Sequence, residues 1–262
     1  MSRNTDDPVC RRASGTEGAP PVNKESRSVR KMFSAIAPRY DLLNHLLSLN
    51  QDKRWRRRLA AAATVPQGAT VLDICAGTGD LGVALARQQS GVRQVVLADF
   101  SAPMLRIAWK KTRGDGRFHC HVCDALRLPF QDGIFDLVIC AYGIRNFEDT
   151  EAGLREMARV TRRGGQLLFL EFFPGLSPCL ELPFRFVFRR LLPFVGRVLS
   201  RHDCAYSYLP DSVAQFHTRE KMTELLAEAG YAEVHWQDLS YGITTLFSAR
   251  ASGAIVCARS AA

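Results

Sequence analysis

The stretch Val71-Leu72-Asp73-Ile74-Cys75-Ala76-Gly77-Thr78-Gly79-Asp80 decides the fold of this chain. Its first four residues form a short, mostly apolar run rich in β-branched side chains, which predicts a buried parallel strand. Small residues and glycines follow, and helical spacing then runs from Leu81 to Arg87. A strand, a glycine turn and a helix form a loop whose backbone can approach a ligand closely, because no Cβ atoms stand in the way.

The glycines of this loop, Gly77, Gly79 and Gly82, satisfy the pattern G-x-G-x-x-G. The pattern alone is weak, because a dinucleotide-binding loop and a purely structural tight turn both produce it. Two carboxylates favour a different ligand. Asp73 lies inside the strand ahead of the glycines, where a backbone nest for a pyrophosphate gains nothing from added negative charge. Asp99 ends a second apolar run about 20 residues further on, where it can accept hydrogen bonds from both hydroxyls of a ribose.

S-adenosylmethionine has a ribose, a sulfonium and an ammonium group, and no phosphate. It therefore suits these two carboxylates better than a dinucleotide does. We expect it to be the cofactor, held by Asp73, Gly77, Gly79 and Asp99 among others.

Between Val71 and Glu171, strand-like and helix-like runs alternate, which predicts an α/β fold with a doubly wound, mostly parallel sheet. Two runs near the end, 233–239 and 244–249, are expected to form an antiparallel hairpin that completes seven strands. Such sheets bind ligands at the carboxyl ends of their strands. The residues predicted to meet there are Asp73 to Gly79, Asp99, Asp124-Ala125, Ala141 to Asn146 and Glu171-Phe172.

The bulk properties of the chain are those of one globular domain. At 262 residues with 47% hydrophobic content it can bury a full core, so residues 29–262 are expected to form a single domain. Residues 1–28 are polar and lack periodicity, which predicts a disordered tail. Eight cysteines without an apolar secretion signal indicate a reducing, cytoplasmic location. No apolar run approaches the roughly 18–20 residues of a membrane span.

The segment His119-Cys120-His121-Val122-Cys123 has the residue types of a metal site. It lies on a predicted strand, where the side chains of Cys120 and Cys123 point to opposite faces. They could not chelate one ion as the same spacing does in a zinc turn. We therefore expect no metal.

Residues 29–64 show helical periodicity in three segments, interrupted at Pro38. The third segment contains the basic run Lys53-Arg54-Trp55-Arg56-Arg57-Arg58. A solvated helix face is the favoured interpretation of this run, ahead of a contact with an acidic membrane surface and of a nucleic-acid patch.

A second unusual segment, residues 180–199, is strongly apolar but contains four arginines, which prevent it from spanning a membrane. We interpret residues 176–215 as a helical insertion that covers the substrate. It is either a buried cover or a basic amphipathic lid that meets a long apolar substrate at a membrane surface.

Further motifs point to a family. They are Met32-Phe33 to Tyr40-Asp41 with Asn44 and Ser48, Trp55-Arg56, Gly143-Ile144-Arg145-Asn146-Phe147, Leu154-Arg155-Glu156-Met157 through Gly164-Gly165, Leu170-Glu171-Phe172 and Tyr206-Ser207-Tyr208-Leu209. With the glycine stretch, this layout resembles the class I S-adenosylmethionine-dependent methyltransferases. Within them it is most similar to the quinone-biosynthesis C-methyltransferases that act on demethylmenaquinol and polyprenyl benzoquinol. The resemblance covers roughly residues 29–250, and its Tyr-Asp and Gly-Ile-Arg-Asn segments are its most specific parts.

The resemblance implies C-methylation of a polyprenyl quinol, with peripheral contact to the inner face of the membrane and a homodimer both compatible with it. It places the cofactor contacts on Thr78, Asp99, Asp124, Ala125 and Ala141. Asp124 is expected to accept from the adenine amino group, and the backbone of Ala125 to serve a ring nitrogen.

This chain also departs from the family pattern. Ala141 replaces a common Ser, Asp52 a common His, and Arg163 a common Pro. Phe247 replaces a frequent His, and we expect this change to matter most, through the substrate pocket.

The catalytic hypothesis concerns the ring carbon, which is a poor nucleophile until an adjacent hydroxyl is ionised. Arg145 is expected to stabilise the developing phenolate, because a guanidinium keeps its proton at neutral pH; the alternative is a surface salt bridge. Asn146, Tyr40 and Tyr206 are the expected orienting groups. His202 or Asp203 could take a proton.

Three other functions compete with quinol C-methylation as interpretations of this sequence. An O- or N-methyltransferase for another small aromatic or lipid would use the same cofactor. A nucleic-acid-binding protein would bind with a steep salt dependence, but it leaves the apolar insertion unexplained. A dinucleotide oxidoreductase would be stabilised by NAD and not by S-adenosylhomocysteine. All three rank below the quinol C-methyltransferase.

Overall fold

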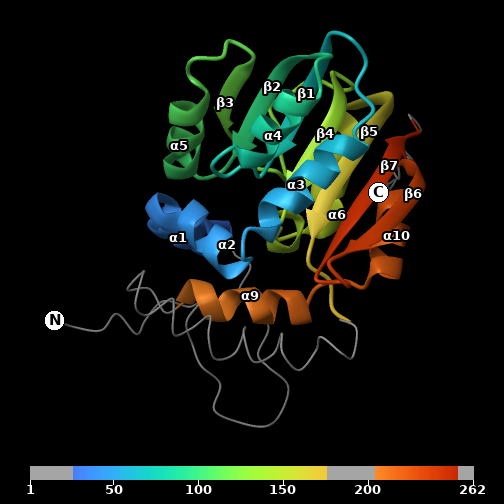
Figure 1. Ribbon diagram of the computed structural model, residues 1–262. Coiled ribbons are helices and arrows are strands. Elements are labelled where there is room, and N and C mark those ends of the chain that lie inside the picture. Colours follow the sequence, from blue (N-terminus) through green and yellow to red (C-terminus); the bar gives the residue numbers. More distant parts are fainter. Residues whose placement is uncertain (1–25, 176–203, 253–262) are drawn as a thin grey trace, which may run out of the picture.

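A computed structural model of the chain describes residues 26–175 and 204–252 (Figure 1). Most of the predicted tail and the core of the predicted insertion, including residues 180–199, His202 and Asp203, lie outside the described residues. The predicted boundary of the tail at residue 28 is wrong by a few residues, because Ser26 already begins the first helix, α1 (Ser26–Ile36).

The described chain is built on one seven-stranded sheet with the order β3-β2-β1-β4-β5-β7-β6. Its strands are β1 (Ala69–Ile74), β2 (Val92–Asp99), β3 (Phe118–Val122), β4 (Phe135–Ala141), β5 (Thr161–Glu171), β6 (Tyr231–Leu239) and β7 (Thr244–Ala251). The first five pair in parallel, and β7 is antiparallel to both β5 and β6. The predicted doubly wound, mostly parallel sheet and the closing hairpin are confirmed.

The register of the parallel strands brings their carboxyl ends to one edge of the sheet. Ile74 of β1 is opposite both Ala98 of β2 and Cys140 of β4. Ala141 of β4 is in turn opposite Leu170 of β5. The residues that follow these strands therefore share a single rim.

Helices cover both faces of the sheet and form two cores. One core joins the sheet to α3 (Gln51–Ala62), α4 (Asp80–Gln88) and α5 (Ala102–Thr112). The other joins it to α6 (Thr150–Val160) and α10 (Arg219–Glu228). The strands of the sheet centre are buried on both faces, which explains their continuous apolar runs.

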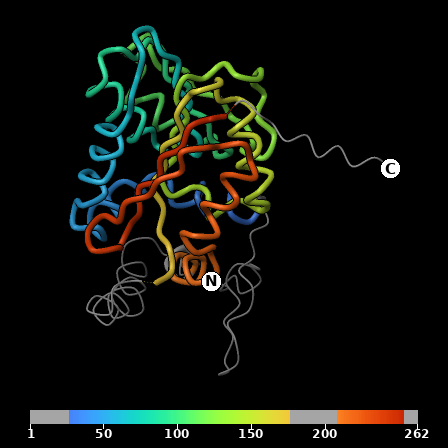
Figure 2. The backbone as a smooth tube through the Cα atoms, turned by 90° about the vertical axis from the view of Figure 1, so that its right-hand side faces the viewer, coloured from blue at the N-terminus to red at the C-terminus, as the bar shows by residue number. Residues whose placement is uncertain are grey.

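Three further elements lie at the rim. They are α1, the short helix η2 (Ala37–Arg39) with α2 (Tyr40–Leu47), and α9 (Cys204–Ala214). Figure 1 shows α1 and α2 below the sheet with α9 beneath them, and Figure 2 shows α9 again at the foot of the molecule. The N-terminal helices and α9 thus enclose the edge where the parallel strands end.

Two local features depart from the regular pattern of helices and strands. Ser101 occupies the N-cap position of α5, but its hydroxyl does not cap the helix and instead bonds the hydroxyl of Ser34 at 2.9 Å. Gly164 and Gly165 lie within β5, where the pairing with β4 jumps from Phe135–Thr161 to Leu137–Gln166. Gly164 has a φ of +73°, which allows this irregularity without Cβ strain.

Candidate functional site

A cavity of about 740 Å³, counting its open mouth, lies at the carboxyl ends of β1, β2 and β4. This volume is in the range of small-molecule sites. Of the predicted site residues, the cavity is lined by Tyr40, Gly77, Asp99, Asp124, Ala125, Ala141 and Asn146. The structure thus brings together side chains from five separate segments of the sequence.

The glycines of the loop after β1 serve different purposes. Gly77, with a φ of +55°, faces the cavity, and a Cβ built on it would lie 4.0 Å from Cε1 of Tyr40. Gly79 packs against Ala108 of α5, where an added Cβ would come within 3.1 Å of the alanine Cβ. Gly82 is closer still to its neighbours, at 2.7 Å from Leu97. Only the first of the three contributes directly to the cavity lining, and the other two allow tight packing of α4 and α5.

Asp99 is the carboxylate that the loop holds in place. Its Oδ2 accepts a hydrogen bond from the Gly77 amide at 2.9 Å, and its Oδ1 accepts one from the Ser101 amide at 2.8 Å. The residue is only 7% exposed, and burial raises the pKa of its carboxyl to about 6. A carboxylate has about four lone-pair sites, so each oxygen can accept one further hydrogen bond from a ligand hydroxyl.

The remaining walls are suited to a flat, apolar group with polar edges. Asp124 accepts from the Leu126 amide at 2.9 Å through Oδ1, and it lines the cavity beside Ala125. Apolar walls come from side chains that the sequence did not single out for the site: Phe100, Met104 and Leu126. A glycine backbone, a fixed carboxylate and an apolar slot fit the parts of S-adenosylmethionine that the sequence predicts here.

Asp73 is not among the residues that line the cavity. Its Oδ2 accepts from the Gly82 amide at 2.8 Å, which ties the first turn of α4 to β1. Its Oδ1 has no hydrogen-bond partner among the described residues, and burial raises the pKa of the carboxyl to about 8. The structure therefore places Asp73 as a support of the loop, where the sequence predicted a contact with the cofactor.

Thr78 and Gly79 also lie outside the cavity lining. The Thr78 side chain is buried, and its hydroxyl donates to Oδ1 of Asp41 on α2 at 2.5 Å. The sequence flagged Asp41 only as part of a motif and predicted no contact for it. Asp41 and Thr78 are 37 positions apart in the sequence, and nothing in the local pattern of either segment reveals that they pair.

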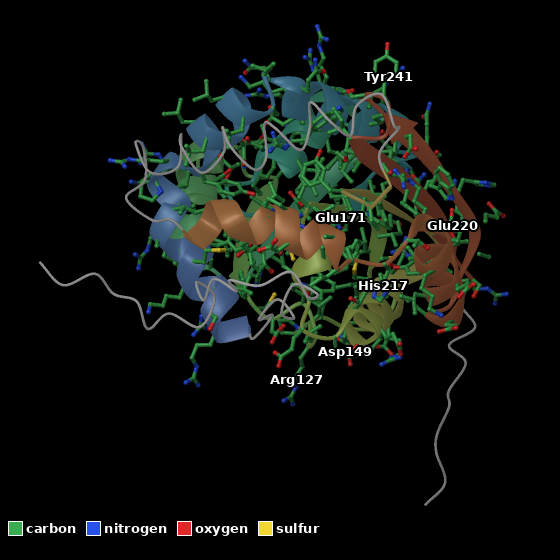
Figure 3. All side chains as sticks on the ribbon, turned by 90° about the horizontal axis from the view of Figure 1, so that it is seen from below. Arg127, Asp149, Glu171, His217, Glu220 and Tyr241 are labelled. Carbon is green, nitrogen blue, oxygen red and sulfur yellow. The ribbon has the colours of Figure 1, made fainter. Side chains whose placement is uncertain are left out.

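Arg145 lies in the short helix η3 (Ile144–Asn146), which follows β4. Its Nη1 donates to Oε1 of Glu171 and to the carbonyl oxygen of Tyr142, both at 2.7 Å. Its Nε donates to Ser212 of α9 at 3.4 Å. Glu171 is fully buried, and Figure 3 shows it close to α9. The alternative of a surface salt bridge is wrong, because both partners of this ion pair are buried.

The charge of Arg145 is stable in this environment. Burial has the largest single effect and would lower the pKa of the guanidinium, but Glu171 together with Tyr208 and Tyr40 outweighs it, and the pKa is raised. Arg145 does not line the cavity itself; its neighbour Asn146 does. Asn146 donates to the Tyr142 carbonyl at 3.2 Å and accepts from the Tyr208 hydroxyl at 3.0 Å.

The two predicted tyrosines differ in what the structure shows. Tyr40 lines the cavity and makes an edge-to-face contact with Phe33, with ring centroids 6.1 Å apart. Burial raises the pKa of its phenol. Tyr206 belongs to α9, but its side chain lies outside the described residues.

Tyr142 lies within the predicted rim segment from Ala141 to Asn146, but the sequence analysis gave it no role of its own; it lines the cavity directly after Ala141. It has a φ of +62°, uncommon for a residue other than glycine. Its ring stacks on Phe172 with centroids 4.5 Å apart and meets Trp55 edge-to-face at 6.3 Å. Such strained backbone is found at functional sites. The position at a strand end was the only available signal.

The departures from the family pattern can now be placed. Phe247 is fully buried in the core, stacked on Phe169 with centroids 4.8 Å apart, and does not line the cavity. The expectation that it alters the substrate pocket is therefore corrected. Asp52 is also buried, and accepts hydrogen bonds from Arg56 at 2.6 Å and Ser48 at 2.8 Å. Arg163 is exposed on β5.

Comparisons with known proteins agree with this geometry. A profile described as the ubiE/COQ5 methyltransferase family matches residues 21–250. The demethylmenaquinone methyltransferase of Thermus thermophilus is 44% identical over 216 residues, which cover 82% of this chain and 97% of that protein. The ubiquinone/menaquinone biosynthesis C-methyltransferase UbiE of Geobacter sulfurreducens is 38% identical over 230 residues, covering 87% of this chain and 90% of that protein.

Solved structures support the fold at much lower identity. The [4+2]-cyclase SpnF superposes with a TM-score of 0.64 at 17% identity, covering 91% of this chain and 98% of that one. An S-adenosylmethionine-dependent methyltransferase from Aquifex aeolicus gives a TM-score of 0.51 at 16% identity, covering 72% and 85%. At these identities the likeness concerns the fold alone.

Proposed function

The chain belongs to the ubiE/COQ5 methyltransferase family, and on this basis we propose that it transfers a methyl group from S-adenosylmethionine to a ring carbon of a polyprenylated quinol. The family is S-adenosylmethionine-dependent, and its members act in menaquinone and ubiquinone biosynthesis. The observation that carries the proposal within this chain is the carboxylate of Asp99, fixed by the Gly77 amide at the floor of an otherwise largely apolar cavity.

The cofactor supplies an electrophilic methyl group on a sulfonium. In the proposed site, the Asp99 carboxylate accepts hydrogen bonds from the ribose hydroxyls, and the Asp124 carboxylate accepts one from the adenine amino group. The backbones of Gly77, Ala125 and Ala141 complete the contacts. Three other predicted residues contribute indirectly by packing helices against the loop. Asp73 binds α4, Thr78 binds α2, and Gly79 packs against α5.

We assign the activation of the quinol ring to the charge of Arg145. Ionisation of a ring hydroxyl pushes electron density onto the adjacent carbon, and a fixed positive charge stabilises the phenolate that forms. Arg145 does not line the cavity, so its guanidinium would act on the oxyanion through an ordered water. Asn146, Tyr40 and Tyr206 would orient the ring.

A conservative substitution tests this role without emptying the site. Arg145→Lys keeps a charge next to Glu171 but loses the planar fork of donors. We expect turnover to fall about 10²–10³-fold, the usual cost of removing one transition-state donor, with unchanged affinity for S-adenosylhomocysteine. Arg155→Lys, in an exposed pair with Glu151, is the matched control. Full activity of Arg145→Lys would remove the guanidinium from the mechanism.

The reaction itself is tested with labelled S-adenosylmethionine and a panel of extracted quinols. A C-methylated ring resists ether and amine chemistry, so the product's mass and position of methylation separate C-methylation from O- or N-methylation. Labelled ether as the main product would contradict the proposal and favour an O-methyltransferase.

We further propose a cytoplasmic protein that touches the membrane surface where its lipid substrate resides. Three leucines at α2 and its C-terminal turn are exposed: Leu42 by 60%, Leu46 by 49% and Leu49 by 80%. The following helix α3 exposes four cations and no acidic residue: Lys53, Arg54, Arg57 and Arg58. Exposed apolar side chains beside basic residues favour an anionic bilayer. Within the described residues, no helix combines the length and apolar character of a membrane span.

Vesicle flotation tests this contact. The protein should float with anionic vesicles and less with neutral ones, and Leu46→Ser combined with Leu49→Ser should weaken flotation. Lys221→Ser combined with Glu224→Ser, an exposed pair on α10, is the control. Equal flotation of both double variants would exclude this surface. A homodimer stays a prediction, to be tested by sedimentation.

A further inference from the structure

We propose that Asp41 is a positioning residue that fastens the N-terminal helices over the cofactor cavity by binding Thr78 of the glycine loop. The inference rests on the proposed function and deepens it, because it assigns a specific device to the same site. Neither residue lines the cavity. The effect of Asp41 is therefore exerted through the loop and through its neighbour Tyr40.

Both oxygens of the Asp41 carboxylate contact side chains outside the N-terminal helices, one in the glycine loop and one on α5. Oδ1 accepts from the Thr78 hydroxyl at 2.5 Å, and Oδ2 lies 2.7 Å from Nζ of Lys111 on α5. The Thr78 side chain is buried, and those of Asp41 and Lys111 are about 30% exposed. One side chain of α2 thus contacts both the glycine loop and the end of α5.

The contact continues into a chain of alternating charges. Lys111 also pairs with Asp80 of α4 at 2.6 Å, and Asp80 lies 3.5 Å from Arg56 of α3. Arg56 in turn donates to the buried Asp52 at 2.6 Å. Exposed single ion pairs are worth little, whereas a network that shares its side chains is ordered by several partners at once. Four helices are connected through this chain, which leaves α2 at Asp41 and returns to it at His45, whose Nδ1 lies 2.7 Å from Oδ2 of Asp52.

The position of α2 determines one wall of the cavity. Tyr40 precedes Asp41 and lies over Gly77, the loop residue whose amide holds Asp99. Phe33 of α1 packs against Tyr40 and lines the same wall. A ligand lying between the loop and this wall contacts both sides. Binding of the ligand and closure of the wall therefore favour each other, as thermodynamic linkage requires.

The test is a double-mutant cycle read as the dissociation rate of labelled S-adenosylhomocysteine. Asp41→Ala and Thr78→Val should each raise this rate about 10–100-fold, the range expected for loss of a charge-assisted hydrogen bond. The double variant should release the ligand no faster than Asp41→Ala alone, because Asp41→Ala already breaks the bond that Thr78→Val removes, together with the pair to Lys111. Thr78→Ser keeps the hydroxyl and should restore slow release.

Two controls separate positioning from general stability. Asp115→Ala removes an exposed carboxylate paired with Arg117 far from the loop, and it should leave the dissociation rate unchanged. The unfolding temperature of the ligand-free protein should change little in Asp41→Ala. Additive effects in the cycle, or fast release explained by a large loss of ligand-free stability, would overturn the inference.

The outcomes also distinguish this inference from the proposed function. If wild-type protein does not bind S-adenosylhomocysteine at all, the proposed function fails. If it binds, and Asp41→Ala releases the ligand at the wild-type rate, only the role of Asp41 is refuted.

Discussion

At the scale of single residues, the two carboxylates of the nucleotide-binding strands illustrate how position decides role. Asp99 ends its strand and faces the cavity, whereas Asp73 lies one residue before the end of β1 and turns to α4. Adjacent side chains of a strand point to opposite faces. The sequence therefore identified Asp73 as a carboxylate near the rim. It did not show that the side chain points to α4 and away from the cavity.

The buried Asp73 leads to a pH prediction. Its folded-state pKa is raised to about 8, against an ordinary value of 3.8. Between these values the unfolded chain loses the proton and the folded chain keeps it, so the free energy of unfolding falls as pH rises, by at most about 1.4 kcal/mol per pH unit. Asp73→Asn cannot ionise. Its stability relative to wild type should rise up to about pH 8 and then level off.

Urea unfolding between about pH 5 and 9 measures this difference. Asp115→Asn is the control, because Arg117 lowers the pKa of that carboxyl; it is ionised in both the folded and the unfolded state over this range, so its difference from wild type should stay constant. A constant difference between Asp73→Asn and wild type across the range would show that Asp73 is ionised in the folded protein at all these pH values.

A second residue-scale prediction concerns Gly143, which begins the turn after Tyr142. A Cβ on Gly143 would lie 2.5 Å from Cβ of Cys75 and 3.0 Å from Sγ of Cys140. Gly143→Ala should therefore destabilise the protein by about 1–3 kcal/mol through overpacking. Gly116→Ala is the matched control, since no atom lies within 4 Å of its added Cβ. Equal urea midpoints for both variants would show that the two thiols can move aside.

At the scale of elements, the basic run of α3 has two faces. Trp55 and Arg56 are buried, while Lys53, Arg54, Arg57 and Arg58 are exposed. Four of the six residues therefore form an exposed face, which both the solvated-face interpretation and the proposed membrane contact require. The spacing of Asp52 and Arg56, four residues apart, places them on one side of a helix and was visible in the sequence. What the sequence could not show is that this side is buried.

Two neighbouring arginines of α3, Arg56 and Arg57, should respond differently to substitution. Arg56→Ala leaves the buried Asp52 without its cationic partner, which should cost about 3–5 kcal/mol. Arg57→Ala removes an exposed side chain and should change stability by less than about 0.5 kcal/mol. Thermal or urea unfolding of both variants checks this. A small effect of Arg56→Ala would mean that water enters and solvates the Asp52 carboxylate.

At the scale of the whole molecule, the strand order and the rim were predictable because apolar runs and strand ends follow general rules. The parallel strands and the closing hairpin are confirmed, and Gly77, Asp99, Asp124 and Ala125 of the predicted rim line the cavity, while their roles stay predictions. The contacts that sequence reasoning missed are long-range: Thr78 with Asp41, and Arg145 with Glu171. Such pairs depend on how helices pack at the rim, which no local pattern encodes.

Ligand binding should stabilise the whole described fold, because the cavity joins the N-terminal helices to three strands. S-adenosylhomocysteine at about 100 times its dissociation constant should add about 2.7 kcal/mol. This corresponds to a rise in unfolding temperature of roughly 5–10 °C for a chain of this size. NAD at the same concentration should have no effect. A larger shift with NAD than with S-adenosylhomocysteine would favour an oxidoreductase.

The position of β7 between β5 and β6 has a consequence for biosynthesis. On one side, β5 pairs only with β7, and 80 residues separate Glu171 at the end of β5 from Ala251 at the end of β7. At about 5–20 residues per second a ribosome needs about 4–16 s to add them. During that interval a nascent chain carries an unpaired hydrophobic strand edge, which is a template for aggregation. Chaperone protection of the emerging polypeptide, and an intact C-terminus, therefore matter more for this topology than for a sheet whose strands pair in the order of their synthesis.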